Sequence, residues 1–541
     1  MIDFGDWMPD QPSMNAGVSR LENGAPAARG FRSVNSPVQV TDADRLFSAY
    51  TFNGFNVPGG TVSMDRIRGL ISTVAVSSGT LSSNIFVGTE TALYKLDVTS
   101  NRFAPWNYDA ATAPAQQDPT YSGVKQWQFA EFATTGGARY VYAAGGPGQI
   151  LQRFPSNGSA APTDVSGAPN ATHVAAISRF LVCGNTSGSE AQIVWSEIDA
   201  AENWGSSNQA GNQVLADTDE VTGIVGGESG LILTRKGLYR MNYVGPPLVF
   251  TFERVANRGC DFAGSVASLS SDQVFFLSED GFQFYNAGRV QNISSERITR
   301  FFFSDFDRSR SADLSCVSDP TSDQIIWSYA SKTASGTNDT LLFYNYVLDK
   351  WGIARTPHDF VGFSRQVGKT LEQLDDPNTT VTFAGSVSAQ SALNLAQNGA
   401  SNLTSLDDMT VSLDSARFAG GSSFLTLAVT RSGACTLNEL AGSVLPLTVE
   451  TGEFEAAPGH FVLVNGLMPH IDAADATIKG AVGARNRQTD ELRFGELATV
   501  NATNYIPSRK SGRYFRGKFT ATGNWSHAYG FQVDAKPQGR R

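Results

Sequence analysis

Apolar hairpins recur along the first two thirds of the chain at a nearly constant spacing. Each consists of an apolar strand, a turn with Gly or a polar cluster, and a second strand with Leu, Phe or Tyr. They occupy residues 84–97, 139–154, 179–198, 231–244, 274–288 and 324–352. Successive hairpins begin roughly 40 to 55 residues apart, a repeat length typical of four-stranded β-propeller blades.

A lone apolar hairpin cannot bury both of its faces, so repeated hairpins must stack on one another. Radial stacking covers the apolar faces and leaves only short strand edges. Continuous apolar runs such as "VFFL" at 274–277 fit inner strands that are buried on both sides. Six hairpins predict an all-β fold with a propeller of about six blades, and the spacing leaves five to seven open. A stack of β-sandwich domains is the structural alternative.

Composition supports an all-β chain with few exposed charges. The 541 residues include 53 Gly and 22 Pro, and only 17% are Asp, Glu, Lys or Arg. The usual charged fraction is about 25%, so part of the surface is expected to be covered by partner subunits. The net charge of -10 and the lack of a strong basic cluster argue against a free nucleic-acid-binding protein. We see no secretory signal and no membrane span.

The hairpin pattern stops at both ends of this region, which predicts that the chain has three structural parts. Residues 1–45 are rich in Pro, Gly and Asn and predict an extended N-terminal arm, anchored on another surface by Trp7 and Phe31. Residues 46–356 form the predicted propeller. Residues 357–541 return to strand patterns, and the alternation in "YFRGKFT" predicts one-sided packing. We therefore expect a C-terminal β-sandwich or platform domain that docks on the propeller, with residues 389–402 as a short helix or loop.

The stretch "SEDGFQF" has the form of an Asp-box hairpin, a structural motif of sialidase-type propeller blades. Its residues are Ser278, Asp280, Gly281 and Phe284. Asp280-Gly281 suits a tight turn that needs a positive φ, and the aromatic residues around it suit the core. We interpret this hairpin as structural. For the arm, Trp7, Pro9 and Asp10 are candidates for contact with a neighbouring subunit.

Residue patterns for catalysis, metal binding and cofactor binding are weak. Acidic groups at 217–220, 374–376 and 406–408 could supply the paired carboxylates of a glycosidase, but such clusters are usually solvated turns. The five histidines lack metal-ligand spacing, and we find no nucleophile elbow and no phosphate-binding glycine loop. The four cysteines form no CxxC pair and are expected to be reduced thiols. We predict no enzymatic activity, no catalytic residue, no metal and no cofactor.

Several stretches of the chain resemble tailed-bacteriophage tail nozzle proteins, the packaged-DNA stabilisation or tail accessory family. They include the "GLYRM" strand, "VFFLSEDGF", the "RVQNI" return and "RFFFSDFD" in the propeller region. Others are "FGDWMPDQPSMN", "LLFYNYVLDKWG", "ETGEFEAAPGHFVLVNGLMPHID" and the ending from "SGRYFRGKFT" onward. The matches span nearly the whole chain and are least distinct over residues 99–230.

The resemblance implies a structural virion protein located in the phage tail, and in the host cytoplasm during assembly. Relatives form a ring, commonly a hexamer, below the portal and its adaptor protein, and contact a tail tip, needle or fibre below. The ring surrounds the exit channel for packaged DNA, retains the genome until ejection, and binds no membrane. An acidic chain suits a lumen that must not grip DNA phosphates.

Two other functions stay open at this point. A phage glycan depolymerase or sialidase-like propeller enzyme would need acidic side chains that converge in an open cleft. A receptor-binding module at the tail tip would need an exposed loop face that recognises the host.

Overall fold

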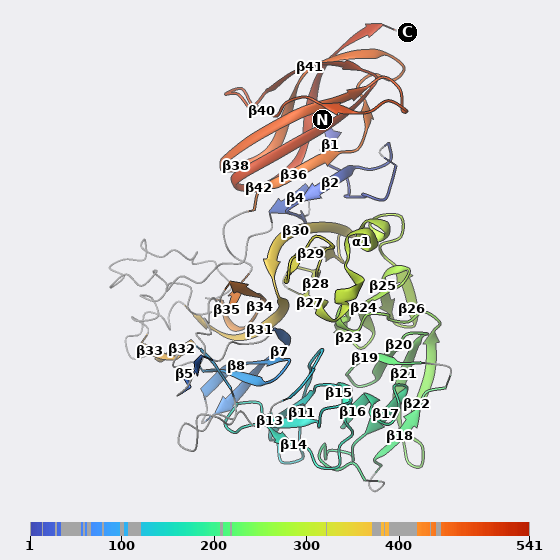
Figure 1. The fold of residues 1–541 in the computed structure, drawn as a ribbon, viewed down its shortest axis with the longest axis vertical. Helices are drawn as coiled ribbons and strands as arrows, with labels where there is room; N and C mark the ends of the chain where they lie inside the picture. The colour runs from blue at the N-terminus through green and yellow to red at the C-terminus, as the bar shows by residue number, and fades with distance from the viewer. Residues whose placement is uncertain are drawn as a thin grey trace.

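The protein is an all-β six-bladed propeller joined to a curled C-terminal sheet (Figure 1). The computed structural model describes, apart from short gaps, residues 2–33, 56–61, 66–105, 121–370, 380–388 and 419–539. Each blade is built from four consecutive antiparallel strands. Five blades are separate four-stranded sheets, and the sixth forms one end of a larger sheet. The predicted propeller with about six blades is therefore confirmed.

The first three blades run from residue 67 to residue 214. Blade 1 contains β7 (Ile67–Ser77), β8 (Thr80–Thr89), β9 (Leu93–Asp97) and β10 (Arg102–Pro105). Blade 2 contains β11 (Gln128–Ala133), β12 (Arg139–Ala144), β13 (Gln152–Pro155) and β14 (Thr163–Asp164). Blade 3 contains β15 (Ala171–Ile177), β16 (Phe180–Thr186), β17 (Gln192–Trp195) and β18 (Gly211–Val214).

The last three blades run from residue 221 to residue 358. Blade 4 contains β19 (Val221–Val225), β20 (Gly230–Thr234), β21 (Leu238–Gly245) and β22 (Val249–Ala256). Blade 5 contains β23 (Ala267–Ser270), β24 (Gln273–Ser278), β25 (Gly281–Asn286) and β26 (Arg289–Asn292). Blade 6 contains β27 (Ser315–Asp319), β28 (Gln324–Tyr329), β29 (Asn338–Asn345) and β30 (Lys350–His358).

Each hairpin predicted from the sequence supplies the two middle strands of one blade. These strands are buried on both faces, as in β20 and β24, where Leu231 to Thr234 and Val274 to Ser278 are all buried. This burial explains why the middle strands are apolar along their whole length and why they gave the strongest repeat signal.

After blade 6 the blade pattern ends, as the sequence indicated. The strand β31 (Phe360–Thr370) pairs with β34 (Ala419–Ser432), and β34 pairs with β35 (Ala434–Glu439). This three-stranded sheet packs against β7 and β27, where the first and sixth blades face each other. Short hairpins are formed by β5 (Asn56–Val57) with β6 (Gly60–Thr61) and by β32 (Thr380–Phe383) with β33 (Gly385–Ser388). The segment predicted as a helix or loop, 389–402, lies outside the described residues.

The C-terminal part is a curled sheet around two long strands. β38 (Phe461–Arg485) pairs with β42 (Tyr514–Gly539) along its whole length, and β41 (Ile506–Gly512) pairs with the other edge of β38. The shorter members are β36 (Leu447–Thr451), β37 (Phe454–Glu455), β39 (Arg493–Phe494) and β40 (Ala498–Thr499). Buried residues alternate with partly exposed ones at the start of β42, which confirms the predicted one-sided packing there.

The N-terminal arm joins the propeller to the C-terminal sheet (Figure 1). β1 (Ile2–Asp3) pairs with β42, and β2 (Val18–Glu22) pairs with β36. The hairpin of β3 (Gly24–Ala27) and β4 (Gly30–Ser33) reaches β30 of blade 6 on one side and β42 on the other. Blade 6, the arm and the C-terminal strands thus form one continuous sheet. The predicted arm exists, but its strands pair within this chain.

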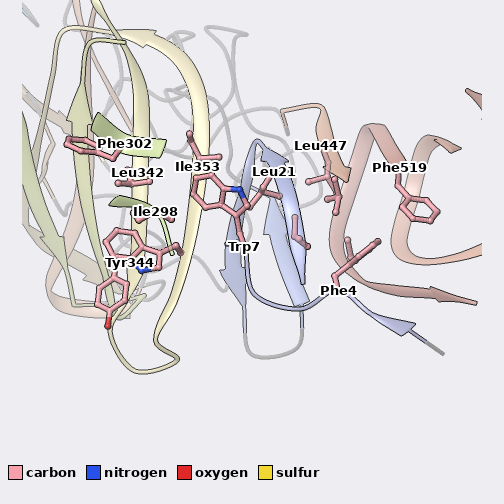
Figure 2. Packing of buried hydrophobic residues seen from close by; sticks show 14 of the residues in the cluster. Phe4, Trp7, Leu21, Ile298, Phe302, Leu342, Tyr344, Ile353, Leu447 and Phe519 are labelled. Atoms are coloured by element: carbon pink, nitrogen blue, oxygen red, sulfur yellow. The ribbon is translucent and has the colours of Figure 1, made fainter. Parts of the chain in front are cut away.

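One hydrophobic core runs through this junction (Figure 2). Trp7 and Leu21 of the arm lie between Ile353 and Tyr344 of blade 6 on one side and Leu447 of the C-terminal sheet on the other. Phe4 packs edge-on against Phe519 of β42, with ring centroids 5.5 Å apart. The arm therefore connects the propeller and the C-terminal sheet through buried side chains as well as through strand pairing.

Candidate functional site

The innermost strand of each blade lines a cavity along the propeller axis. The first strands β7, β11, β15, β19, β23 and β27 all contribute residues to it, and its volume is about 450 Å³. The lining combines apolar residues such as Leu70, Trp127 and Ile224 with polar ones such as Gln128 and Glu131. Phe360 and Phe363 of β31 also reach it.

A second cavity, which we call the mouth, adjoins the axial cavity where the inner strands begin. Its volume is about 580 Å³, and it shares Gln126, Ala263 and Gly264 with the axial cavity. Five charged residues line it, namely Lys125, Glu190, Glu220, Arg235 and Asp261. The turn "GGPG" at 145–148 forms part of the rim.

Ion pairing and burial set the electrostatics of the mouth. The Arg235 Nε donates to Glu220 Oε2 at 2.6 Å, and Asn185 Nδ2 donates to Glu220 Oε1 at 3.1 Å. Asp261 accepts a hydrogen bond from the backbone N–H of Glu279 at 2.8 Å. Burial raises the pKa of Asp261, and the nearby carboxylates of Glu279 and Asp280 add to the effect. The mouth therefore offers one fixed guanidinium, that of Arg235, and one carboxyl group, that of Asp261, whose pKa is raised by burial.

No pattern in the sequence predicted this mouth. Glu220 belongs to the acidic group 217–220, which was interpreted as a solvated turn, and the structure places its side chain at the rim. Glu190 lies between β16 and β17, Arg235 between β20 and β21, and Asp261 between β22 and β23. These residues are far apart in the sequence, so their spacing does not indicate that they meet. Only the propeller topology brings them together.

A buried polar network lies where the ring closes between blades 6 and 1. Asp313 accepts from Arg66 Nη1 at 2.5 Å, from Arg310 Nε at 2.9 Å and also from Arg68. Arg66 and Arg68 lie at the start of blade 1, whereas Asp313 precedes β27 of blade 6. Since no strand of one blade is exchanged with the other, these ion pairs and the packing of β31 hold the two ends of the ring together.

Behind this network a serine and a histidine are hydrogen-bonded in the core. Ser328 Oγ lies 2.7 Å from His358 Nε2, and His358 Nδ1 lies 2.7 Å from the carbonyl oxygen of Thr356. The carbonyl can only accept, so Nδ1 carries the proton and Nε2 accepts from the serine. Ser328 is 0% exposed and His358 is 1% exposed. The pair is a structural element of blade 6 and is not accessible to a substrate.

Stability is expected to fall between pH 6.5 and pH 4 because two histidines are buried in the neutral form. Burial lowers the pKa of His173 and of His358 to about 4. Unfolded histidines bind protons near pH 6.5, so the unfolded state takes up more protons in this window. Each histidine should cost up to about 1.4 kcal/mol of stability per pH unit as the pH falls. Urea unfolding at several pH values measures this slope, and His173→Gln with His358→Gln should flatten it. A slope unchanged by both substitutions would contradict the assignment.

The predicted structural hairpin is present in blade 5. Ser278 pairs with Gly281, so Glu279 and Asp280 form the two-residue turn. Gly281 has φ of +114°, whereas Asp280 has no positive φ. The hairpin is therefore present, but the predicted turn pair Asp280-Gly281 is off by one residue. Gly281, which carries the positive φ, is the first residue of β25. Phe284 stacks on Phe275, with ring centroids 4.3 Å apart, and Asp280 forms an exposed ion pair with Arg258.

Two of the three arm residues predicted to contact a neighbour make their contacts inside the chain. Trp7 is 2% exposed and lies edge-on against Phe301, with ring centroids 5.1 Å apart. The carboxylate of Asp10 accepts from the backbone N–H groups of Arg300 and Phe301 at 2.6 and 2.7 Å. It thereby caps the N-terminus of α1 (Thr299–Asp305). A contact of Pro9 with a neighbouring subunit stays a prediction.

The described residues contain no group of His, Cys, Asp and Glu arranged to hold a metal ion. Cys183, Cys260 and Cys316 are free thiols, as expected, and the side chain of Cys435 lies outside the described part. No helix in the described ranges is long and apolar enough to span a membrane.

Comparison with known proteins gives structural neighbours only. No family model and no curated protein matches the chain. A structure of BBS1N in complex with ARL6DN is 10% identical, with 73% of this chain and 98% of that chain covered and a TM-score of 0.35. The dihydro-heme d1 dehydrogenase NirN is 11% identical, with 82% and 74% covered and a TM-score of 0.32. A putative 6-phosphogluconolactonase from Bacteroides uniformis is 12% identical, with 43% and 79% covered and a TM-score of 0.27. We draw no functional argument from these three.

Proposed function

We propose that the protein is a structural virion subunit that forms the tail nozzle ring of a tailed bacteriophage. The ring lies below the portal and its adaptor protein, surrounds the DNA exit channel and helps to retain the packaged genome until ejection. The resemblance of "GLYRM", "VFFLSEDGF" and the C-terminal stretches to the nozzle family motivates this proposal.

The observation that best supports the proposal is the continuous core through the N-terminal arm. A passive wall must transmit force between the rings above and below it without opening between its own parts. The arm binds the propeller to the C-terminal sheet by strand pairing on both sides and by buried side chains such as Trp7 and Phe4. A binding module on a flexible linker would not need this junction.

Imaging of whole particles tests the proposal. Antibody-labelled or tagged protein should be found on the central axis below the portal vertex, and a particle reconstruction should contain the propeller in a ring there. Protein found only on peripheral spikes, or absent from purified particles, would refute it. Particles that lack the protein should lose packaged DNA.

The mouth favours a second candidate, a propeller that cuts or binds glycans. Burial raises the pKa of Asp261, which is the direction of shift expected for a general acid, and Glu190 and Glu220 line the same mouth. If the protein is such an enzyme, the purified protein should release reducing sugar from host capsule or lipopolysaccharide. Asp261→Asn should lower that activity at least about 100-fold, the usual contribution of a general acid. Glu455→Gln, which changes a carboxylate of the C-terminal sheet, is the control. If the wild-type protein releases no sugar, the hypothesis that it is a glycan-cutting enzyme is refuted.

A further inference from the structure

The two parts of the chain carry opposite charge. Residues 1–444 contain 29 Lys and Arg against 42 Asp and Glu, whereas residues 445–541 contain 12 against nine. The C-terminal sheet is therefore basic, although the whole chain has a net charge of -10. In Figure 1 this sheet stands apart from the propeller at one end of the molecule, with β38 and β42 as its longest strands.

Arg516 lies on the side of β42 that faces away from the core. Its neighbours Phe515 and Gly517 are buried, whereas Arg516 is half-buried. Its partner across the pair of long strands is Gly483 of β38. A side chain at Gly483 would meet Leu492 and Phe494, so these two apolar residues cover the sheet beside Arg516. The guanidinium group of Arg516 is therefore partly shielded from water.

Arg516 has no hydrogen bond and no ion pair to any residue that the structure describes, and its buried Nε lacks a partner. The charges around it are already paired. Arg485 binds Glu453 through two hydrogen bonds of 2.5 Å, and Lys518 binds Glu450 at 2.9 Å. Burial lowers the pKa of Arg516 and outweighs the opposing attraction of Glu453 and Glu450, whose carboxylates are hydrogen-bonded or ion-paired to Arg485 and Lys518. A half-buried guanidinium without an acceptor is costly, and an added carboxylate would offset the cost.

We propose that Arg516 receives a carboxylate side chain from the acidic propeller of a second copy of this chain. The contact joins two different surfaces, the basic sheet of one copy and the acidic propeller of the next. A heterologous contact of this kind generates a ring when its rotation closes. The inference rests on the proposed ring and identifies the face and the residue through which its subunits meet.

A protein carboxylate fits this position better than the phosphates of DNA. Phosphate binding relies on several exposed basic side chains along a strand. Here the guanidinium is half-buried, and the neighbouring Arg485 and Lys518 are neutralised by Glu453 and Glu450. One unpaired planar group matches one carboxylate, which it can bind with two parallel hydrogen bonds. The 42 acidic residues of the remaining chain provide the complementary charge.

Self-association of the purified full-length chain tests the inference. Mass photometry or sedimentation velocity should detect assemblies at low salt. Arg516→Gln should weaken assembly about 30-fold or more, because a desolvated charge pair loses one partner. Arg516→Lys should weaken assembly by an intermediate amount, since lysine keeps the positive charge but cannot form two parallel hydrogen bonds to one carboxylate. Arg493→Gln is the matched control, because Arg493 pairs with Glu491 at 80% exposure on the same sheet and should have almost no effect.

The outcomes separate this inference from the proposed function. Assemblies unaffected by Arg516→Gln would refute the role of Arg516 while leaving a ring in place. Wild-type protein that stays monomeric at every concentration would also refute it, and particle imaging would still decide whether the protein lies in the tail. Arg516→Gln could instead weaken binding to short duplex DNA and leave self-association unchanged. That result would contradict the contact between subunits and assign Arg516 to phosphate binding.

Discussion

Asp313→Ala is expected to destabilise the propeller by about 3–5 kcal/mol, because it removes the shared partner of buried charges. Arg66, Arg68 and Arg310 all bind this carboxylate, whose side chain is 8% exposed. Without it the arginines repel one another at the junction of blades 1 and 6. Urea unfolding followed by tryptophan fluorescence measures the change.

The matched control for this substitution is Asp280→Ala. Asp280 also pairs with an arginine, but its side chain is 64% exposed, so its loss should cost at most about 1 kcal/mol. Equal effects of the two substitutions would mean that the ring closes by packing alone. Burial acts to raise the pKa of Asp313, but the three arginines outweigh it and lower the pKa. The stabilisation of the fold by this carboxylate is therefore present above the pKa of an unfolded aspartate, and it is lost as the pH falls through the lowered pKa.

Trp7→Ala should separate the C-terminal sheet from the propeller. The substitution leaves a cavity in the core that the arm shares with both parts, at a cost of about 3–5 kcal/mol. We expect unfolding to split into two transitions, and limited proteolysis to release the C-terminal sheet. Both results follow because the arm is the only described strand connection between the two parts.

Trp204→Ala serves as the control for Trp7→Ala. Trp204 lies in blade 3, is only half-buried, and donates to the carbonyl oxygen of Ala201 at 3.0 Å. It should lower stability by less than Trp7→Ala and leave a single transition. A single, unshifted transition in Trp7→Ala would show that strand pairing alone holds the junction.

The middle strands of the blades could be predicted from the sequence because burial on both faces requires apolar residues throughout. The runs at 231–234 and 274–277 therefore show a repeat that the partly exposed outer strands do not. The alternation in β42 was also recognisable, because one face of that strand packs and the other does not.

The mouth of the cavity and the role of the arm could not be predicted in the same way. Arg235 and Glu220 meet only because two strands of blade 4 lie side by side, and Asp261 joins them from the next blade. The Pro-rich segment around Trp7 predicted an anchor on another surface. Its partner in the structure, Phe301, lies almost three hundred residues away in the sequence. Such long-range contacts leave no local pattern.

The pairing of β1 with β42 has a consequence for synthesis of the chain. β1 is synthesised long before the strand it pairs with, because Ile2 pairs with Phe531. At about 5–20 residues per second the arm stays without this partner for roughly half a minute to nearly two minutes. A product that stops before β42 keeps unpaired backbone groups at β1, so we expect such truncated products to be open to proteases there.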